Sequence, residues 1–280
     1  METNLLVALS NLVQNPITDI LATYNSSNRI NNVGEALEYY VRDLFCNTVG
    51  ESDSNIENKI LTHSQYFSYI GNQNNPPDVM IRGGDAIEVK KIEGVNSGIA
   101  LNSSYPKDKL YADSPMITNA CRTAENWTEK DLLYVVGVIK DSKLKKLWFV
   151  YGDCYAANKE VYERISNKIS QGLNELKDVE FGETNELARV NRVDPLGITY
   201  LRVRGMWGIE NPHRVFNYVI PSQVDNDLVV NAIMLKTKYE SFPESDRKNI
   251  ENKLEIKDVK IKSPNNPANL LDAKVLSFRI

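Results

Sequence analysis

Three charged residues in one short segment have the types and spacing of a site that cleaves phosphodiesters. Asp78 opens an apolar run, and Glu88 and Lys90 lie inside the next one. Charged side chains on rigid strands cost desolvation energy unless they find partners. Two carboxylates can bind Mg²⁺ together with water and phosphate oxygens, and a lysine can orient or help to deprotonate an attacking water. The segment therefore predicts Mg²⁺-dependent phosphodiester hydrolysis.

The two apolar runs predict a β-hairpin that would hold these side chains. Its strands are expected at residues 78–82 and 86–92, joined by the glycine pair at residues 83–84. Glu88 and Lys90 are two residues apart, so a strand places them on one face.

The loop length decides whether Asp78 joins them. A two-residue loop would put Asp78 on the opposite face. A three-residue loop at residues 83–85 would pair Met80 with Glu88 and Asp78 with Lys90, which gathers all three charges. The active-site interpretation thus requires an odd loop or a bulge, and consecutive glycines supply the positive φ angle it needs. The alternative is a surface hairpin on which Glu88 and Lys90 form an exposed pair.

A helix before the hairpin offers a further acid. Residues 34–45 carry an apolar stripe at helical spacing, with Glu38 at its border and Glu35 in the first turn. Alternatively, both acids could be solvated or could stabilise the positive N-terminal end of the helix dipole. Of the two, Glu38 is the preferred candidate to face the hairpin.

Length and composition indicate a globular protein. The chain has 280 residues, of which 42% are hydrophobic and 25% charged, enough for a substantial core. No stretch approaches the roughly 18 apolar residues of a membrane span, and the N-terminus lacks the basic region of a secretory signal. The three dispersed cysteines lack zinc or disulfide spacing. We expect a cytoplasmic protein with no membrane contact.

Charge and motifs narrow the functional classes. The net charge of −4 argues against indiscriminate coating of nucleic acid but is compatible with a local basic cleft. Two histidines leave little room for histidine-based metal chemistry. No glycine-rich phosphate-binding or dinucleotide-binding motif is present, so nucleotide hydrolysis and dinucleotide redox chemistry have no visible site.

Several polar and basic residues could contact DNA. After the hairpin, Ser103, Ser104 and Lys107 suit phosphate contacts. The segment from residue 189 to residue 214 contains five arginines and two acidic residues, which gives it a net charge of +3. A strand at residues 198–204 would point Arg202 and Arg204 to one side, about 7 Å apart, which is about two base-pair steps.

Arginine reads guanine bidentately, so this pair could reach neighbouring guanines. In the loop that follows, Asn211 and Arg214 could supplement the pair. The alternative is an arginine-rich strand that faces solvent or an acidic helix.

The remaining pattern predicts a mixed α/β fold with helices flanking a central sheet. We expect a single domain over residues 1–280, with a helical part at 1–76, a catalytic core at 77–180, and a DNA-recognition and C-terminal part at 181–280. Further helices are expected at 4–13, 16–24, 115–125, 158–177, 226–236 and 243–254, strands at 131–140, 143–151 and 256–262, and loops at 25–32 and 49–76.

The hairpin resembles the PD-(D/E)xK nuclease superfamily, with Pro77-Asp78 followed after nine residues by Glu88-Val89-Lys90. The resemblance implies the αβββαβ restriction-endonuclease-like core. It further implies that Asp78, Glu88, the carbonyl of Val89 and Glu38 hold the metal, with Lys90 as the catalytic lysine. Lys91 could also approach the phosphate, although parity places Lys90 beside Glu88.

Several stretches resemble the NgoPII-like family of type II restriction endonucleases. They are Gly34-Glu-Ala-Leu-Glu38, Pro77-Asp78 to Lys90, Leu101-Asn-Ser-Ser-Tyr-Pro-Lys107, Lys145-Lys-Leu-Trp-Phe-Val-Tyr-Gly-Asp153 and Leu201-Arg-Val-Arg-Gly-Met-Trp-Gly208. The resemblance implies a homodimer that makes Mg²⁺-dependent cuts in double-stranded DNA at a short palindrome, GGCC. It also implies a cognate methyltransferase that protects host DNA.

Two other functions fit parts of the same pattern. A non-catalytic DNA-binding module could keep a nuclease fold, but it would have no need for all three charges of the hairpin. A junction resolvase or repair nuclease would read DNA shape, whereas the arginines and asparagine of the last third favour base reading.

Overall fold

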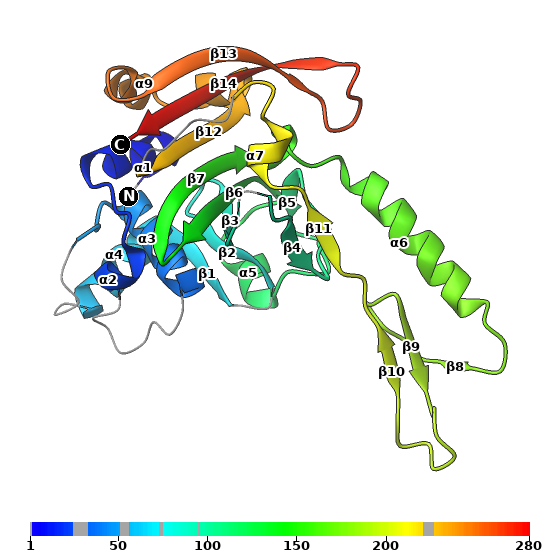
Figure 1. Ribbon diagram of the computed structural model, residues 1–280. Helices are drawn as coiled ribbons and strands as arrows, with labels where there is room; N and C mark the ends of the chain where they lie inside the picture. Colours follow the sequence, from blue (N-terminus) through cyan, green and yellow to red (C-terminus); the bar gives the residue numbers. More distant parts are fainter. Residues whose placement is uncertain (1, 25–32, 51–55, 73–74, 95, 221–226) are drawn as a thin grey trace.

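The computed structural model describes residues 2–24, 33–50, 56–72, 75–94, 96–220 and 227–280 (Figure 1). The loop expected at residues 25–32 lies outside the described residues. Among the described residues, no helix is long and apolar enough to cross a membrane.

A mixed β-sheet forms the centre of the fold, as the sequence predicted. Its strand order is β1-β2-β3-β6-β7-β12-β14-β13, with β5 added to β6. The pairs β3–β6 and β7–β12 are parallel, whereas the other neighbours are antiparallel. The strands are β1 (Phe67–Asn72), β2 (Asn75–Ile81), β3 (Ala86–Ile92), β5 (Lys109–Tyr111), β6 (Glu129–Lys140), β7 (Lys143–Tyr151), β12 (Val229–Leu235), β13 (Glu255–Lys262) and β14 (Leu270–Arg279).

The helices and two small sheets surround this centre. The small sheets contain β4 (Ile99–Asn102) with β11 (Trp207–Ile209), and β8 (Glu180–Phe181) with β9 (Ala188–Asn191) and β10 (Leu201–Val203). The α-helices are α1 (Leu5–Gln14), α2 (Ile20–Tyr24), α3 (Val33–Cys46), α4 (Ile56–Tyr66), α5 (Asn119–Thr123), α6 (Lys159–Asn174), α7 (Pro212–Val215), α8 (Lys236–Ser241) and α9 (Glu244–Glu251), and a 3₁₀ turn follows β7 (Gly152–Cys154).

Three expectations about local structure were wrong. The described part of residues 49–76 contains α4 and β1, not only loops. The helix expected at 226–236 is largely strand β12, because an apolar run buried between β7 and β14 need not alternate. Helix α5 starts at Asn119, not at Pro115, because Thr118 caps it by accepting a hydrogen bond from the Cys121 N–H.

Two further expected elements are shorter than the pattern suggested. The strand expected at residues 198–204 is only β10, and α2 begins at Ile20 rather than at Pro16. The Asp19 carboxylate accepts from the Ala22 N–H, which explains the later start of α2.

The expected boundary at residue 180 does not divide the sheet, since β12, β13 and β14 belong to it.

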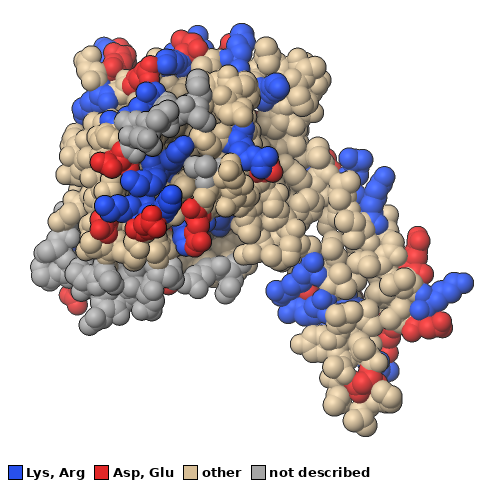
Figure 2. All heavy atoms as spheres, in the orientation of Figure 1, with Lys and Arg blue, Asp and Glu red and all other residues tan. Residues whose placement is uncertain are grey.

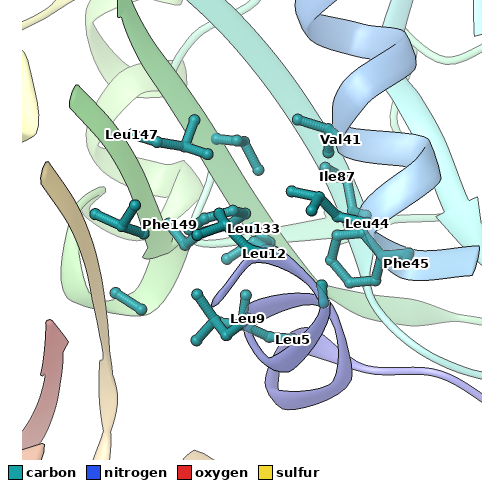
Figure 3. Close-up of a cluster of buried hydrophobic side chains, with 14 of the residues drawn as sticks. Leu5, Leu9, Leu12, Val41, Leu44, Phe45, Ile87, Leu133, Leu147 and Phe149 are labelled. Carbon is teal, nitrogen blue, oxygen red and sulfur yellow. The ribbon is translucent and has the colours of Figure 1, made fainter. Parts of the chain in front are cut away.

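One face of the sheet is covered by the N-terminal helices. Leucines of α1 and the apolar stripe of α3 meet side chains of β3, β6 and β7 in a single cluster (Figure 3). At Gly137 of β6, an added Cβ would lie 2.6 Å from Leu37 Cδ2, so the glycine allows α3 to approach the sheet. This packing holds β3 rigid from one side.

The opposite face carries a second core and the functional residues. Ala86 and Ile92 of β3 belong to this core, and Glu88 and Lys90 share their face by parity. From the edge of this face, α6 and the β8–β9–β10 sheet extend away from the body (Figure 1). Residues 159–206 are called the arm below.

The helical layer is tied together by one buried carboxylate. Asp43 of α3 is fully buried and accepts hydrogen bonds from Tyr24 Oη (2.9 Å) and Thr48 Oγ1 (2.7 Å). Its oxygens also contact His63 Nε2 at 3.0 Å and the Lys59 ammonium. One side chain thus joins α2, α3 and α4.

Asp43→Asn should lower the free energy of unfolding by about 3 kcal/mol, because it leaves buried donors and the Lys59 charge without their carboxylate. Denaturant titration followed by circular dichroism measures this loss. The matched control is Glu244→Gln, which breaks the exposed Glu244–Lys248 pair (2.7 Å) and should cost less than about 0.5 kcal/mol. Equal losses in the two variants would contradict this role for Asp43.

Candidate active site

The hairpin has an odd loop, as the gathering of the three charges requires. Val79 pairs with Ile87 and Met80 with Ala86, and the Ile81 N–H donates to the Asp85 carbonyl. The loop is therefore residues 82–84, one residue earlier than expected, and Gly83 has a φ of +67°. The expected pairing of Met80 with Glu88 was wrong. The same parity nevertheless puts Asp78, Glu88 and Lys90 on one face.

The three groups interact directly or at short range. Lys90 Nζ lies 2.6 Å from Glu88 Oε1, and Asp78 Oδ2 accepts a 2.6 Å hydrogen bond from the Val89 N–H. Glu88 is buried and Lys90 partly so, which disagrees with the alternative of an exposed surface pair. The pair therefore lies at the edge of the protein interior and not on a solvated face.

Charge crowding shifts the ionisation of this group. Burial, and then the charge of Glu88, raise the pKa of Asp78 well above its usual range. Burial alone would lower the pKa of Lys90, but the carboxylates of Glu88 and Asp78 outweigh it and raise this pKa. Without a bound cation, Lys90 is therefore a firmly protonated partner of two crowded carboxylates.

The residues present fit a divalent cation. Glu88 Oε2 is buried and has no hydrogen-bond partner in the structure, which is costly for a carboxylate oxygen. A cation beside Asp78 and Glu88 would satisfy this oxygen and offset the repulsion that raises the pKa of Asp78. Among the described residues, no three His, Cys, Asp or Glu side chains form a complete metal site, so water, main-chain or phosphate oxygens must complete the coordination.

Glu38 of α3 lies within electrostatic reach of the site. Its charge raises the pKa of Asp78 and of Lys90. Burial in turn raises the pKa of Glu38, while Arg42, 3.9 Å away, opposes that shift. The charge of Glu35 adds to the rise in the pKa of Glu38. The charge of Glu38 thus acts on two residues of the hairpin.

The site opens into a cleft of about 690 Å³ between the body and the arm. Figure 2 shows the hollow between these two parts of the molecule. Segments far apart in the chain supply its lining. Among the lining residues are those expected to act on DNA: Asp78, Glu88, Lys90, Ser103, Ser104, Arg202 and Arg204.

The two arginines share a partner across the arm. Arg202 Nη2 lies 2.7 Å from Glu186 Oε1, Arg202 Nε donates to Glu186 Oε2 at 2.8 Å, and Arg204 Nε also contacts Oε1. Both guanidiniums thus point to one side, as expected. Both guanidiniums are nevertheless about half exposed, so a ligand in the cleft can still reach them.

Lys107 is buried rather than exposed to a phosphate. Its ammonium donates to Ser104 Oγ and to the Tyr105 carbonyl (3.2 Å), and burial lowers its pKa to about 8. The Lys107 main chain also bonds Tyr134 Oη, and Tyr134 is the neighbour of Glu88 on β6. The structure therefore gives Lys107 a role in holding the Ser104 loop beside the sheet.

Three other residues expected to contact DNA do not line the cleft. Asn211 is 1% exposed, caps α7 by accepting from the Arg214 N–H, and donates to the Ser97 carbonyl at 2.7 Å. Arg214 pairs with Glu210 (2.9 Å) and Lys91 with Glu93 (2.9 Å). Each of these three side chains thus already forms a hydrogen bond or an ion pair within the protein.

Sequence reasoning missed several lining residues. Asn72 and Asn75 flank the start of β2, and Thr184, Asn185 and Glu186 precede β9. The asparagine-rich stretch before Pro77-Asp78 is a signal that could have been used. Glu186 had no such signal, because only the β9–β10 pairing brings it to the arginines.

Comparison with known proteins gives two matches. A sequence model described as NgoPII restriction endonuclease matches residues 3–264. The type II restriction enzyme NgoPII of Neisseria gonorrhoeae is 49% identical over 280 residues, which cover 99% of this chain and all of that relative. No solved structure matches this chain.

Asp78→Asn should make the metal-free protein more heat-stable at pH 8. Since the folded-state pKa of Asp78 is raised, ionisation of its carboxyl costs stability as pH rises from about 4 through that pKa. The gain should therefore shrink as pH falls toward 4. Ca²⁺ or Mg²⁺ should raise the melting temperature of the wild type much more than that of the variant.

Thermal melts at several pH values, with and without the metal, measure both effects. Glu93→Gln removes an exposed carboxylate close to the same hairpin and should behave as the wild type does. An equal metal-induced rise in the wild type and in Asp78→Asn would place the metal elsewhere.

Proposed function

This chain belongs to the NgoPII restriction endonuclease family, and on that basis we propose a residue-level account of how it cuts DNA. It is a type II restriction endonuclease, a site-specific deoxyribonuclease that binds DNA and uses a divalent metal. Family membership thus selects this function over a non-catalytic binding module and over a shape-reading resolvase or repair nuclease. The proposal specifies the metal ion, the residues that bind it and contact DNA, the DNA sequence that is cut, and the oligomeric state.

The metal is Mg²⁺, which Asp78, Glu88 and the carbonyl of Val89 would hold, with Glu38 contributing through water. The observation that carries this assignment is the buried Glu88 Oε2, which lacks a partner beside a second crowded carboxylate. Hard carboxylate oxygens are the ligands that Mg²⁺ prefers. When bound, Mg²⁺ offsets the charge that develops on the scissile phosphate.

The side chains of the hairpin then have separate tasks. Lys90 lies 2.6 Å from Glu88, so its ammonium is held beside the carboxylates that would bind the metal. Its positive charge orients the water and stabilises the phosphate oxygens. The Val89 N–H holds Asp78 in place through a 2.6 Å bond, which limits its motion during the reaction.

The rest of the cleft binds the duplex. Ser103 and Ser104 contact the backbone, with Lys107 fixing the loop that carries them. Arg202 and Arg204 leave Glu186 and read neighbouring guanines in the major groove, which suits the site GGCC. Because Glu186 neutralises both guanidiniums in the free protein, only a well-placed acceptor can replace it, which favours specific over indiscriminate binding.

We further propose a homodimer. A palindrome offers two equivalent half-sites, and a two-fold axis would place the catalytic hairpin of one copy at each DNA strand. A cognate methyltransferase would protect the same site in host DNA. Action in the cytoplasm agrees with three buried, unpaired cysteines.

Asp78→Ala should reduce plasmid cleavage in Mg²⁺ by on the order of 1,000-fold or more, because bound metal supplies several kcal/mol of charge stabilisation. Binding of a cognate duplex in Ca²⁺ should change little. The control is Glu93→Ala, at an exposed carboxylate near the same hairpin, which should cut normally. Wild-type cleavage by Asp78→Ala would move the active site elsewhere.

Arg202→Ala and Arg204→Ala should each cost about 1–3 kcal/mol of affinity for the cognate duplex and relax discrimination at one base pair. Affinities for GGCC and for singly substituted duplexes, in Ca²⁺ at fixed salt, test this. Arg192→Ala, on the same arm but outside the cleft lining, is the control. Equal losses of affinity on all sequences would mean that both arginines contact only the DNA backbone.

A further inference from the structure

The loop of the catalytic hairpin is held by charged side chains from outside the hairpin. Lys130 of β6 donates to the Ile81 carbonyl (3.2 Å) and to the Gly84 carbonyl (2.6 Å). Glu125, which precedes β6, pairs with Lys130 and accepts from the Gly83 N–H at 3.0 Å. The polar main-chain groups of the loop are therefore bound by side chains that take no part in the proposed chemistry.

A second set of contacts holds Asp85, the residue directly before β3. Its carboxylate accepts a hydrogen bond from Tyr151 Oη of β7 (2.6 Å) and lies 2.7 Å from Lys238 Nζ of α8. The same ammonium lies 2.7 Å from Asp131 Oδ2 and above the ring of Tyr151 (4.9 Å to its centroid). The Asp85 carbonyl accepts from the Ile81 N–H at 2.9 Å, which closes the loop. One lysine from α8 thus fixes the residue that closes the hairpin loop.

The charges that hold the loop are largely withdrawn from water. Asp85 is 7% exposed, Lys130 is 6% exposed, and the side chain of Lys238 is 16% exposed. Burial opposes the charge of Lys238, but the neighbouring aspartates outweigh burial and raise the pKa of this lysine, so the ammonium stays charged. Buried ion pairs are often no more stabilising than apolar side chains of the same volume. Such pairs can instead select one arrangement of the chain, which here is the length of the hairpin loop.

The length of this loop decides on which face of the hairpin Asp78 lies. The observed loop, residues 82–84, places Asp78 on the face of Glu88. A loop one residue shorter would shift the pairing and turn Asp78 to the opposite face. The hydrogen bond between Ile81 and Asp85 closes the loop only at the observed length. Because both residues are also held by lysines from outside the hairpin, the observed length is favoured.

The two aspartates that Lys238 bridges are neighbours on paired strands. Ala86, the first residue of β3, pairs with Leu132 of β6, so Asp85 and Asp131 occupy the position just before this pair. Two carboxylates so placed repel each other, and the ammonium between them offsets that repulsion. Without this ammonium, the repulsion would push the start of β3 away from β6.

We propose that Lys238 is a positioning residue that sets the metal-binding carboxylates of the hairpin beside each other. By holding Asp85 against β6, it keeps the loop length that brings Asp78 to the face of Glu88. The inference rests on the proposed function, because these two carboxylates are the metal ligands assigned there. It gives helix α8, which lies outside the cleft lining, a share in the chemistry.

Amide hydrogen exchange in the metal-free, full-length protein tests the inference without cleavage. Lys238→Met keeps most of the side-chain volume but removes the charge. In this variant the amides of residues 79–89 should exchange about 10-fold or more faster than in the wild type, because the two aspartates then repel each other. Rates are taken relative to the amides of α3, whose buried stripe makes their exchange a measure of global unfolding. Circular dichroism confirms the fold, and Lys238→Gln replaces Lys238→Met if that variant does not fold.

The matched control is Lys274→Met. Lys274 of β14 is equally exposed (16%), lies 2.9 Å from Asp258 Oδ2 and stacks over the ring of Tyr239 (5.4 Å), the residue after Lys238 on α8. It thus makes the same kinds of contact on a strand far from β3 in the sheet order. Exchange in the hairpin should stay at the wild-type rate in this variant. Equal acceleration in Lys238→Met and Lys274→Met would contradict a specific role for Lys238.

Metal binding gives a second readout. The dissociation constant for Ca²⁺, measured by calorimetry without DNA, should rise about 10-fold in Lys238→Met and stay unchanged in Lys274→Met. The Mg²⁺ concentration for half-maximal cleavage should rise in the same proportion. The rate at saturating Mg²⁺ should change little, because bound metal itself holds the carboxylates together. A variant that was only less folded would instead lose rate at every Mg²⁺ concentration.

Removing the repulsion should partly restore the metal site. Asp85→Asn leaves one carboxylate at the start of the paired strands, so Asp85→Asn/Lys238→Met should bind Ca²⁺ more tightly than Lys238→Met does. Lys238→Arg, which keeps a charge between the aspartates, should stay close to the wild type. A double variant that binds Ca²⁺ no more tightly than Lys238→Met would overturn the inference.

The remaining outcomes separate this inference from the proposed function. Unchanged hairpin exchange in Lys238→Met would sink the inference whatever the cleavage activity. Faster exchange with an unchanged Ca²⁺ dissociation constant would also contradict it, because the lysine would then not position metal ligands. Equal Ca²⁺ affinity in the wild type and in Asp78→Asn would instead overturn the proposed metal site, and the exchange rates would still show whether Lys238 holds the hairpin.

Discussion

The repulsion between two neighbouring carboxylates is the constraint on which the rest of this structure depends. Asp78 and Glu88 lie on adjacent strands in a partly buried site, where burial and then the charge of Glu88 keep the pKa of Asp78 high. A flexible segment would relieve such crowding by moving apart. Here β3 is paired on both sides and its other face is packed against α3, so the carboxylates stay together. Lys90 offsets part of their charge, a task that the proposed metal ion would share.

The cleft lies between this rigid centre and the arm. The pairing of β4 with β11 connects the loop after the hairpin to the end of the arm. Tyr105, Tyr162 and Trp207 stack at the same junction, so the base of α6 is fixed against the body. The proposed function assigns chemistry to the interior sheet and DNA reading to the arm. Such a division would let the reading surface vary without disturbing the carboxylates.

Electrostatics in the free protein prepares both parts for an anionic ligand and a cation. Glu186 neutralises Arg202 and Arg204 on the arm, and Lys90 neutralises Glu88 in the site. On the proposed function, each internal partner stands where a phosphate, a base edge or a metal would act. With a net charge of −4, the chain has no overall attraction for DNA, so binding would depend on exchanging these local pairs.

Local spacing alone was enough to predict the hairpin, the mixed sheet and helix α3, and to predict that an odd loop would gather Asp78, Glu88 and Lys90 on one face. These features follow from the periods of strands and helices and from the need for an odd glycine-containing loop. Only the tertiary structure decided which residues meet across long separations. It paired Glu186 with two arginines and turned an apolar run expected to be a helix into the buried strand β12. It also buried Asn211 as a helix cap and Lys107 as a loop anchor. Such outcomes depend on contacts between distant segments, and no pattern within a short window contains that information.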